Sequence, residues 1–407
     1  MIKLLDKSRL SFFNYFFVFC FFVYAGKATI FARELGDIRT IGNAFALLLT
    51  IVFIIRNKIR FSNSFLITQI IFLVYALITV LIYHHLSLWW ISLNVLCLTY
   101  AYVLCEGFKE KLFSVIETVL FHLAIISIIF WILFLISPNL VESIVKTFQF
   151  SATYSEGGNV EANMIIYTFP NLEYGSKEFN LWVRNPGFAW EPGAFASMLC
   201  LGLFCNRLRT NFRLSNNPAF WIFLIALVST QSTTGLTIFG GMILLWLLEN
   251  HKFRPIVIMI PLIGYIFTLP FVWDKIFFEY DKIGTLDIRT VAGPQGRFIS
   301  LALDWEEFLR HPIWGLGCNF QNTWLNQHGY DISTISGIGE LLSVYGGVIT
   351  IIFSIVLIKS ARLVDKTFGL NNPWIMIIVV VGMMISYNLW QSPIYIACWM
   401  YCIFRKK

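Results

Sequence analysis

Long apolar segments restrict this chain more than any other feature of its sequence. A helix that crosses a bilayer needs about 20 mostly apolar residues, and about twelve stretches of the chain approach that requirement. Only 13% of the residues are charged, against about 25% in a soluble domain. We therefore predict an all-α polytopic membrane protein that forms a single integral membrane domain over residues 1–407. The predicted spans are 10–25, 38–55, 65–83, 88–105, 112–136, 187–205, 220–230, 236–248, 255–272, 338–358, 374–387 and 393–404.

The distribution of basic residues predicts how these spans are oriented. Lys and Arg gather in the short cytoplasmic loops of membrane proteins. With the N-terminus inside, every predicted inner segment is basic, including Arg56–Arg60, Arg207–Arg213 and Lys359–Lys366. Both termini are therefore predicted to be cytoplasmic. The net charge of +7 reflects this orientation, and no nucleic-acid partner is expected.

Two predicted outer loops, 137–186 and 273–336, are much longer than the others. Long loops in a compact protein are usually functional or disordered. The second loop contains a stretch, 297–310, whose apolar residues recur with a helical period. Such a helix either lies on the membrane surface or caps a cavity. Its apolar positions are Phe298, Leu301, Ala302, Trp305, Phe308 and Leu309.

The first loop ends in a charged pair at the mouth of the sixth predicted span. Arg184 precedes that span, and Glu191 stands directly before Pro192, a residue that suits the first position of a helix. Glu191 either caps the helix through its carboxylate or serves as a base or a substrate-binding group. Arg184 either anchors the span at the interface or binds an anion.

The second loop supplies two more arginines and a turn rich in glycine. Arg297 opens the amphipathic stretch, where free backbone N–H groups and a guanidinium would together bind a phosphate. Arg289 is the other candidate, and a surface salt bridge is the alternative for both. The run from His311 to Asn319 contains Gly315 and Gly317, which predict a tight turn or a close backbone approach. His311, next to a proline, is expected to be structural.

Proton transfer and sugar binding have further candidates on the same side of the membrane. His328 lies in the second loop, and Glu340 stands where apolar sequence resumes. Arg33 and Arg39 in the first outer hairpin either complete the site or form a solvated turn. Aromatic residues such as Trp190 and Trp305, together with Trp314 and Trp324, either stack on sugars or form an interfacial belt. No cluster has the ligand spacing of a metal site, and no cofactor is expected.

Four local patterns, taken in order, resemble the Wzy-type O-antigen polymerases and, more distantly, the O-antigen ligases. They are Arg184–Gly193, the polar apex Ser229–Gly235, Gly296-Arg297 followed by His311–Phe320, and Glu340–Gly347. The match covers roughly residues 180–350. The apex carries Gln231 and Thr234 where the family often has an arginine. The His-Asn pair that ligases carry before the glutamate helix is missing here, which weakens the ligase reading.

The resemblance implies a GT-C-like, metal-independent glycosyltransferase in a bacterial inner membrane. It would join oligosaccharide repeats linked to undecaprenyl diphosphate on the periplasmic face, with undecaprenyl diphosphate as the leaving group. Membrane lipid and a chain-length regulator protein are its candidate partners. Three residues are candidates for the general base, and nine for substrate binding. The base candidates are His328, Glu340 and Glu191; the binding candidates are Arg184, Arg289, Arg297, Arg33, Arg39, Trp190, Trp305, Asn319 and Tyr345.

Two other functions remain open at this level. A ligase would transfer finished polymer to a lipid A core. A flippase for lipid-linked oligosaccharides would place basic residues in a cavity within the spans. Here the predicted spans are nearly free of Lys and Arg, and the charge lies in the loops. The two long loops are accordingly expected to form two walls of one periplasmic site.

Overall fold

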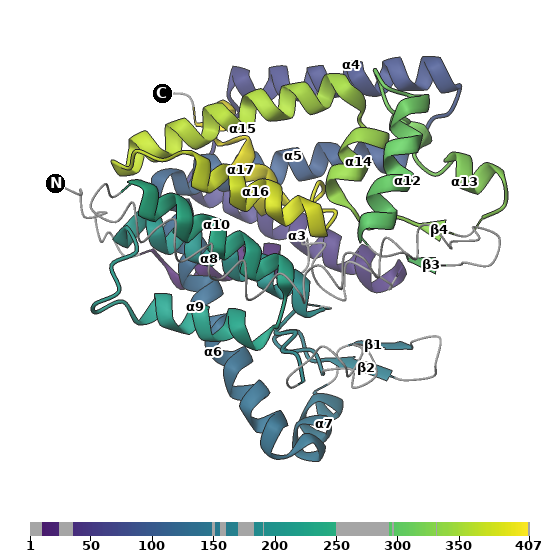
Figure 1. Cartoon of the computed structure of the whole chain (residues 1–407). Coiled ribbons are helices and arrows are strands. Elements are labelled where there is room, and N and C mark those ends of the chain that lie inside the picture. The colour runs from purple at the N-terminus through teal and green to yellow at the C-terminus, as the bar shows by residue number, and fades with distance from the viewer. Residues whose placement is uncertain are drawn as a thin grey trace. The chain divides into compact units, whose positions relative to one another are not determined.

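The chain is a predominantly helical protein whose only sheets are two pairs of short strands among the residues that the structure describes (Figure 1). The computed structural model describes residues 10–23, 36–148, 151–154, 160–169, 183–189, 191–249, 293–294, 297–330 and 332–405. These residues form two compact units, and we describe each by itself. The first comprises residues 1–58, 107–249 and 364–379; the second comprises 59–106, 250–363 and 380–407.

The first unit is built around apolar helices that pack on one another. Helix α6 contacts α8, α9 and α1, and α8 also contacts α9 and α10. A short amphipathic helix, α7, and the antiparallel strands β1 and β2 follow α6; Ser151 pairs with Asn163. The bounds are α1 Phe12–Val23, α3 Gly36–Asn57, η1 Lys109–Lys111, α6 Leu112–Ile136, α7 Pro138–Thr147, β1 Ser151–Tyr154, β2 Val160–Asn163, α8 Pro192–Thr210, α9 Pro218–Ser229 and α10 Thr233–Glu249.

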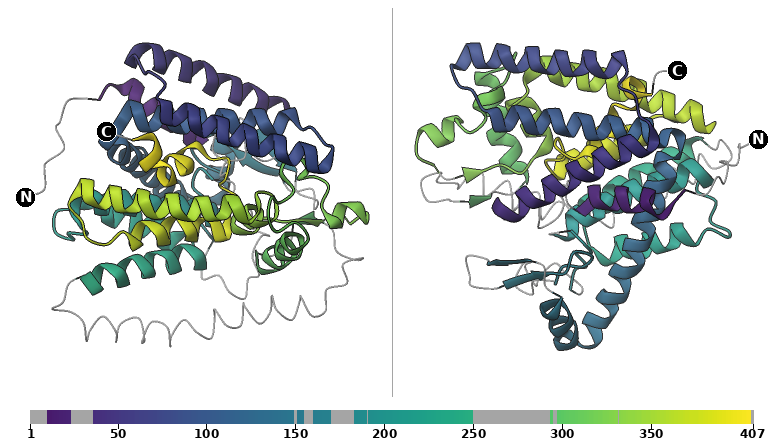
Figure 2. Two further views of the ribbon diagram at one scale, coloured as in Figure 1. Left: turned by 90° about the horizontal axis from the view of Figure 1, so that it is seen from above. Right: turned by 180° about the vertical axis from the view of Figure 1, so that it is seen from behind.

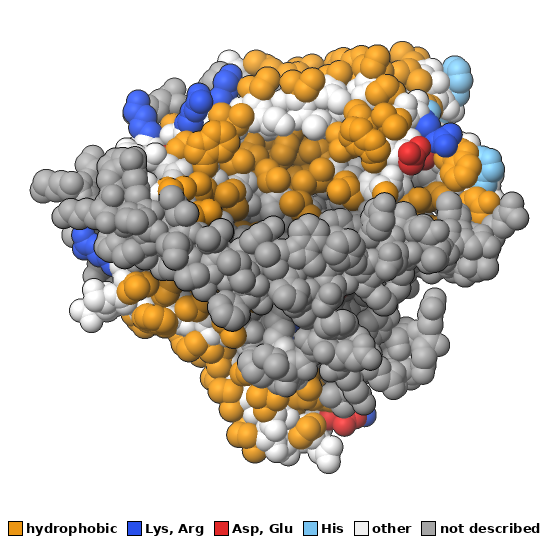
Figure 3. All heavy atoms as spheres, in the orientation of Figure 1, with side chains coloured by type: hydrophobic (Ala, Val, Ile, Leu, Met, Phe, Trp, Pro, Cys, Tyr) orange, Lys and Arg blue, Asp and Glu red, His pale blue; other side chains and the backbone are white. Residues whose placement is uncertain are grey.

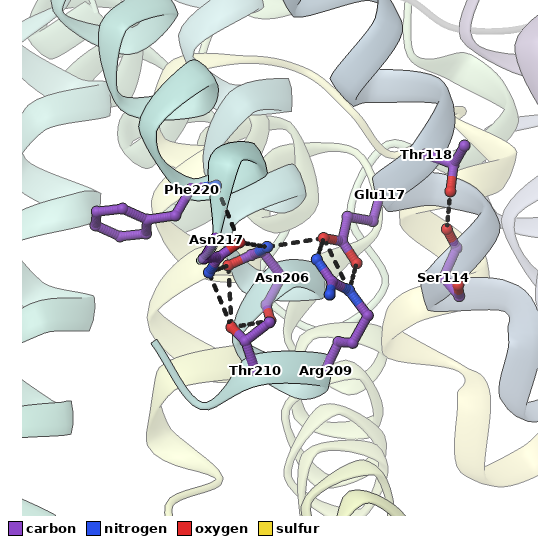
Figure 4. A network of polar contacts seen from close by, with 8 residues as sticks. All are labelled: Ser114, Glu117, Thr118, Asn206, Arg209, Thr210, Asn217 and Phe220. Carbon is purple, nitrogen blue, oxygen red and sulfur yellow. Dashed lines mark hydrogen bonds and ion pairs between the residues drawn. The ribbon is translucent and has the colours of Figure 1, made fainter. Parts of the chain in front are cut away.

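A polar network joins α6, α8 and the start of α9 (Figure 4). The buried Glu117 carboxylate accepts hydrogen bonds from Arg209 Nη2 at 2.7 Å, Arg209 Nε at 3.0 Å and Asn206 Nδ2 at 2.8 Å. The amides of Asn206 and Asn217 donate to each other's oxygens at 3.0 and 2.9 Å. Because a buried charge is tolerated when it is paired and hydrogen-bonded, this network holds the helix ends without an unpaired carboxylate.

A second ion cluster in the same unit surrounds Arg207, whose side chain is fully buried. Its guanidinium lies 3.3 Å from Glu249 at the end of α10 and 3.5 Å from Asp365. The predicted inner loop around Arg207–Arg213 therefore contributes structural ion pairs. Both clusters join different helices of the first unit and serve to fix them.

The second unit consists of long apolar helices and a group of shorter helices. Parallel strands β3 and β4 pair Gly293 with Ile332. Helices α15 and α16 begin in one unit and end in the other. The bounds are α4 Asn63–Tyr83, α5 Leu88–Phe108, β3 Gly293–Pro294, α12 Arg297–Arg310, η3 Gly317–Asn319, α13 Trp324–Gln327, β4 Ile332–Ser333, α14 Gly337–Ser343, α15 Gly346–Phe368, α16 Trp374–Ser386, α17 Pro393–Trp399 and α18 Tyr401–Phe404.

Within this unit the long helices share a direction, and α12 runs crosswise to them (Figures 1 and 2). The C-terminal end of α4 and the N-terminal end of α15 both bind the segment 311–317: Tyr83 donates to the Gly315 carbonyl, and Gly347 N–H donates to the Pro312 carbonyl. The exposed Arg60 lies just before the N-terminal end of α4, and the exposed Lys359 lies in the C-terminal half of α15.

A space-filling view shows apolar side chains gathered along α4, with acidic, basic and histidine side chains at the end where α12 and α13 lie (Figure 3). Side chains on α4 such as Leu66, Ile70 and Leu81 are about half exposed or more. In water such a surface would be costly to expose, but in a bilayer it contacts lipid. Apolar side chains along the helix and charged side chains at its end are the distribution expected of a helix that crosses a membrane.

Three helical stretches among the described residues are long and apolar enough to cross a membrane: 63–83, 88–136 and 346–368. Shorter apolar helices coincide with several other predicted spans, including Phe12–Val23, Pro218–Ser229 and Thr233–Glu249. The total of twelve spans stays a prediction, and the ninth span, 255–272, lies outside the described residues. The helical character of the chain is confirmed, and its long apolar helices are compatible with a helical membrane protein.

Several predicted spans differ from the helices observed, and at two of them the difference arises at a glycine. Helix α8, in the sixth predicted span, begins at Pro192, because Gly187 has a φ of +55° and its segment forms a turn. The tenth predicted span is broken into α14 and α15 at Gly346, whose φ is +73°. A Cβ at Gly346 would meet the backbone of the 313–315 segment, so the break is imposed by a contact between distant parts of the chain.

Candidate functional site

Three ionisable residues of α12 and its end follow one face of the helix. Asp304, Glu307 and His311 are spaced i, i+3 and i+7, which places them in a row. Asp304 and Glu307 are buried, at 6% and 7% exposure, and the His311 side chain is 31% exposed. This carboxylate row, defined as Asp304, Glu307 and His311, is the clearest concentration of proton-transfer chemistry among the described residues of the second unit.

The middle of the carboxylate row is held by the residues around it. Glu307 Oε2 accepts the backbone N–H of Trp324 at 2.8 Å, and Glu307 Oε1 lies 3.6 Å from His311 Nε2. On its other side, His311 Nδ1 lies 3.1 Å from the Tyr83 hydroxyl, which itself donates to the Gly315 carbonyl at 2.8 Å. The His311 ring is thus fixed between a carboxylate and a phenol.

At the start of the row, Asp304 packs against α14. A Cβ on Gly339 would fall on the Asp304 carboxyl, so only glycine allows this approach. The Ser343 hydroxyl donates to Asp304 Oδ1 at 3.4 Å. The pKa of the Asp304 carboxyl is raised from 3.8 to about 8, and burial is the largest cause. Hydrogen bonds from Thr334 and Ser343 lower this pKa, while the nearby carboxylates of Glu340 and Glu307 raise it. These effects favour the protonated form of Asp304 at neutral pH.

Glu340 stands beside this pair in the first turn of α14. Ser336 caps the helix by accepting the Gly339 N–H at 3.1 Å, which fixes the position of the following residue. Glu340 is half-buried, so it is more accessible than Asp304. Two carboxyl groups in unequal environments are the usual arrangement by which one stays protonated and the other acts as a carboxylate.

The segment from His311 to Gly317 fixes the carboxylate row relative to α14 and α15. Leu316 N–H donates to the Ser343 carbonyl at 2.9 Å, and Gly317 N–H donates to the Val344 carbonyl at 2.7 Å. Gly315 has a φ of +61°, and a Cβ there would meet the Val344 carbonyl. The tight turn and close backbone approach predicted from these glycines are confirmed.

The amphipathic stretch 297–310 is a helix, as predicted, but its apolar strip is not buried. Trp305 and Leu309 are 47% and 54% exposed, whereas Ser300, Asp304 and Glu307 face the protein. An apolar strip is turned toward a protein core in water but can be turned outward where lipid is the surrounding medium. Sequence reasoning therefore missed Asp304 and Glu307; their spacing with His311 on the opposite strip was the available signal.

His328, predicted as a candidate base, lies on the exposed turn after α13. Its Nδ1 is 2.8 Å from the Trp324 carbonyl, and its ring packs at a tilt of 36° against Trp324 with centroids 4.3 Å apart. Trp324 also lies beneath the Arg310 guanidinium, at 4.9 Å from the ring centroid. Because Trp324 N–H binds Glu307, this aromatic turn is attached directly to the carboxylate row.

Two predicted binding residues of the second unit have other contacts. Tyr345 is buried at 2% exposure, and its hydroxyl donates to Asn94 Oδ1 at 2.9 Å. Its ring packs on Trp390 with centroids 4.8 Å apart, so it serves the helix core. Asn319 is half-buried in η3, a turn that contacts α4. Neither is brought next to Asp304 by a contact that the structure records among the described residues.

The first unit holds Arg184 and Glu191. Arg184 Nε donates to the Thr230 carbonyl at 2.9 Å, at the polar apex between α9 and α10. Its neighbour Asn185 is fully buried and donates to Ser229 Oγ at 2.9 Å and Ser127 Oγ at 3.3 Å. Glu191 is the N-cap residue of α8, and its side chain makes no capping hydrogen bond with that helix.

The structure does not describe the side chains of five predicted site residues. Arg33, Trp190 and Arg289 lie outside the described residues, and Arg39 and Arg297 belong to α3 and α12 with side chains outside the description. Among the described residues, no group of three or more His, Cys, Asp or Glu side chains is arranged to hold a metal ion.

The comparisons with known proteins identify no relative of this chain. No protein-family model, curated protein or solved structure matches it. Its function is therefore inferred from its own residues and motifs.

Proposed function

We propose that this protein is a polysaccharide polymerase of the Wzy type, which joins oligosaccharide repeats linked to undecaprenyl diphosphate outside the cytoplasmic membrane. The observation that supports this most is the placement of buried Asp304, which packs on Gly339, beside half-buried Glu340 at one end of long apolar helices. The ordered motifs from Arg184 to Gly347 supply the likeness to these polymerases. The apolar helices suit a substrate that is itself a lipid.

In the proposed reaction, a hydroxyl of one lipid-linked repeat attacks the anomeric carbon of the growing chain. The new C–O bond forms as the bond from that carbon to the diphosphate oxygen breaks, and undecaprenyl diphosphate leaves with the electron pair. Glu340 accepts the hydroxyl proton as general base, a role worth about 10²- to 10⁴-fold in rate. Asp304 keeps its own proton and so adds no second negative charge beside Glu340.

The leaving diphosphate needs positive charge, because its charge grows as the bond breaks. We assign this role to Arg297 and Arg289 of the second loop. Arg184, in the first unit, has a hydrogen bond to Thr230 that orients its guanidinium, and it stays a separate candidate for an anion contact. His328 and the aromatic turn around Trp324 are assigned to the sugar rings, since aromatic faces stack on apolar faces of ligands.

A cell-free assay tests the proposal. Purified protein is mixed with lipid-linked repeats isolated from cells that lack this chain, and products are separated by length. A polymerase lengthens the chains and releases undecaprenyl diphosphate; unchanged single repeats contradict the proposal. Adding lipid A core to a parallel reaction distinguishes a ligase, which would attach chains to the core and would not lengthen them.

A further inference from the structure

The C-terminal part of helix α12 has one side that faces the protein and one side that is exposed. The carboxylate row faces the protein, as described above. The exposed part of the helix carries Ala302, Trp305 and Leu309 on one side and Glu306 and Arg310 on the other. Because successive residues turn by about 100° around a helix axis, these form two adjacent strips, one apolar and one charged.

Two adjacent strips of this kind match the boundary between lipid and water. A helix in that boundary places its apolar strip among acyl chains and its charged strip among head groups and water. Trp is also enriched at the membrane–water interface, because its ring is apolar and its N–H is polar. A helix exposed to water alone would gain nothing from Trp305 and Leu309 at about half exposure.

The place of α12 in the second unit agrees with this division. It runs crosswise to α4 and α15 at the ends that bind segment 311–317 (Figures 1 and 2). Both long helices expose apolar side chains, including Leu81 near the end of α4 at 64% and Ile351 near the start of α15 at 62%. Ile313, which follows α12, is 59% exposed and joins these surfaces.

We infer that α12 lies in the membrane–water interface and that the occupant of its exposed apolar strip is bilayer lipid. The ends of α4 and α15 that expose apolar side chains are bonded to segment 311–317, which follows α12 directly, so a bilayer that surrounds these helices also reaches the strip. The inference does not depend on the proposed reaction. If both hold, α12 places the carboxylate row at the depth of lipid head groups, where the diphosphate of a lipid-linked substrate lies.

Site-specific fluorescence tests this inference on the full chain. Trp305→Cys, Leu309→Cys and the matched control Glu306→Cys each carry an environment-sensitive dye, in a Cys402→Ser background because the other native cysteines are buried. The proteins are reconstituted into phosphatidylethanolamine–phosphatidylglycerol vesicles that contain nitroxide-labelled phosphatidylcholine. Nitroxide lipid should quench the dyes at 305 and 309 more than the dye at 306, and aqueous iodide should show the reverse order.

Two outcomes would overturn the inference. Equal iodide quenching at all three positions would place the whole helix in water. Protection of positions 305 and 309 from both quenchers would mean that protein covers the strip, either a second copy or another partner. A Leu301→Cys variant, at a half-buried position of the same helix, reports whether the labelled proteins keep α12 folded.

Discussion

The Asp304 carboxyl lies against the backbone of Gly339 with Ser343 as a hydrogen-bond donor. Its raised pKa has a consequence for stability. Between the ordinary value of 3.8 and about 8, the unfolded chain ionises this group while the folded protein keeps the proton. The folded protein then binds more protons than the unfolded chain, so stability must fall as pH rises through this window.

Asp304→Asn tests this linkage, because asparagine imitates the neutral acid in size and polarity. The melting temperature of the wild type in detergent should fall from pH 6 to pH 8 relative to that of Asp304→Asn, with the difference levelling above pH 8. Parallel curves across this range would mean that Asp304 is already ionised in the folded protein.

Glu307 is expected to act mainly as a structural acceptor. Its replacement by alanine removes the partner of Trp324 N–H, and an unsatisfied buried donor costs about 1–3 kcal/mol. Glu307→Gln keeps an oxygen for this bond and should be milder. Denaturant unfolding of both variants is compared with Glu306→Ala, an exposed neighbour expected to change stability by less than about 0.5 kcal/mol. An alanine variant as stable as that control would show that the bond contributes nothing.

At the scale of elements, α12 and α14 meet through a glycine. Gly339→Ala would place a methyl group on the Asp304 carboxyl, so α12 must move or the contact must open. We expect a lower melting temperature and loss of polymerisation. Gly240→Ala is the matched control: it lies exposed in α10 with no atom near its Cβ position, and alanine there should stabilise the helix by about 0.5–1 kcal/mol. If the two variants have the same melting temperature and the same polymerisation activity, the contact between Gly339 and Asp304 does not fix α12 against α14.

The helices could be predicted from the sequence because a helix that crosses a bilayer must be long and apolar. Both properties can be read from one continuous segment of the chain. The close approach at Gly315 was also predictable, since two glycines in a short run indicate a tight turn or a close backbone approach. The break at Gly346 was not, because it depends on a contact with Gly315, some thirty residues earlier. The orientation of α12 was left open between the membrane surface and the cap of a cavity. The side of the helix that faces the protein, with Asp304 buried and Trp305 exposed, depends on its packing against α14.

At the scale of the whole molecule, the predicted orientation remains to be tested. In the second unit, His85 follows α4 on the side of α12, and Lys359 lies toward the opposite end of α15. With cysteines at these exposed positions, a membrane-impermeant maleimide added to intact spheroplasts should label His85→Cys at once and Lys359→Cys after lysis. The reverse pattern would place the carboxylate row in the cytoplasm and contradict the proposed substrate.

The central claim is that Glu340, beside Asp304, acts as the general base of glycosyl transfer, and the cell-free assay with two variants tests it most directly. The wild type should lengthen lipid-linked repeats. Glu340→Gln should lose about 10²- to 10⁴-fold in rate as a general-base variant, whereas Asp304→Asn, which keeps a neutral group, should retain most activity. Chain extension by Glu340→Gln at the wild-type rate would contradict the account.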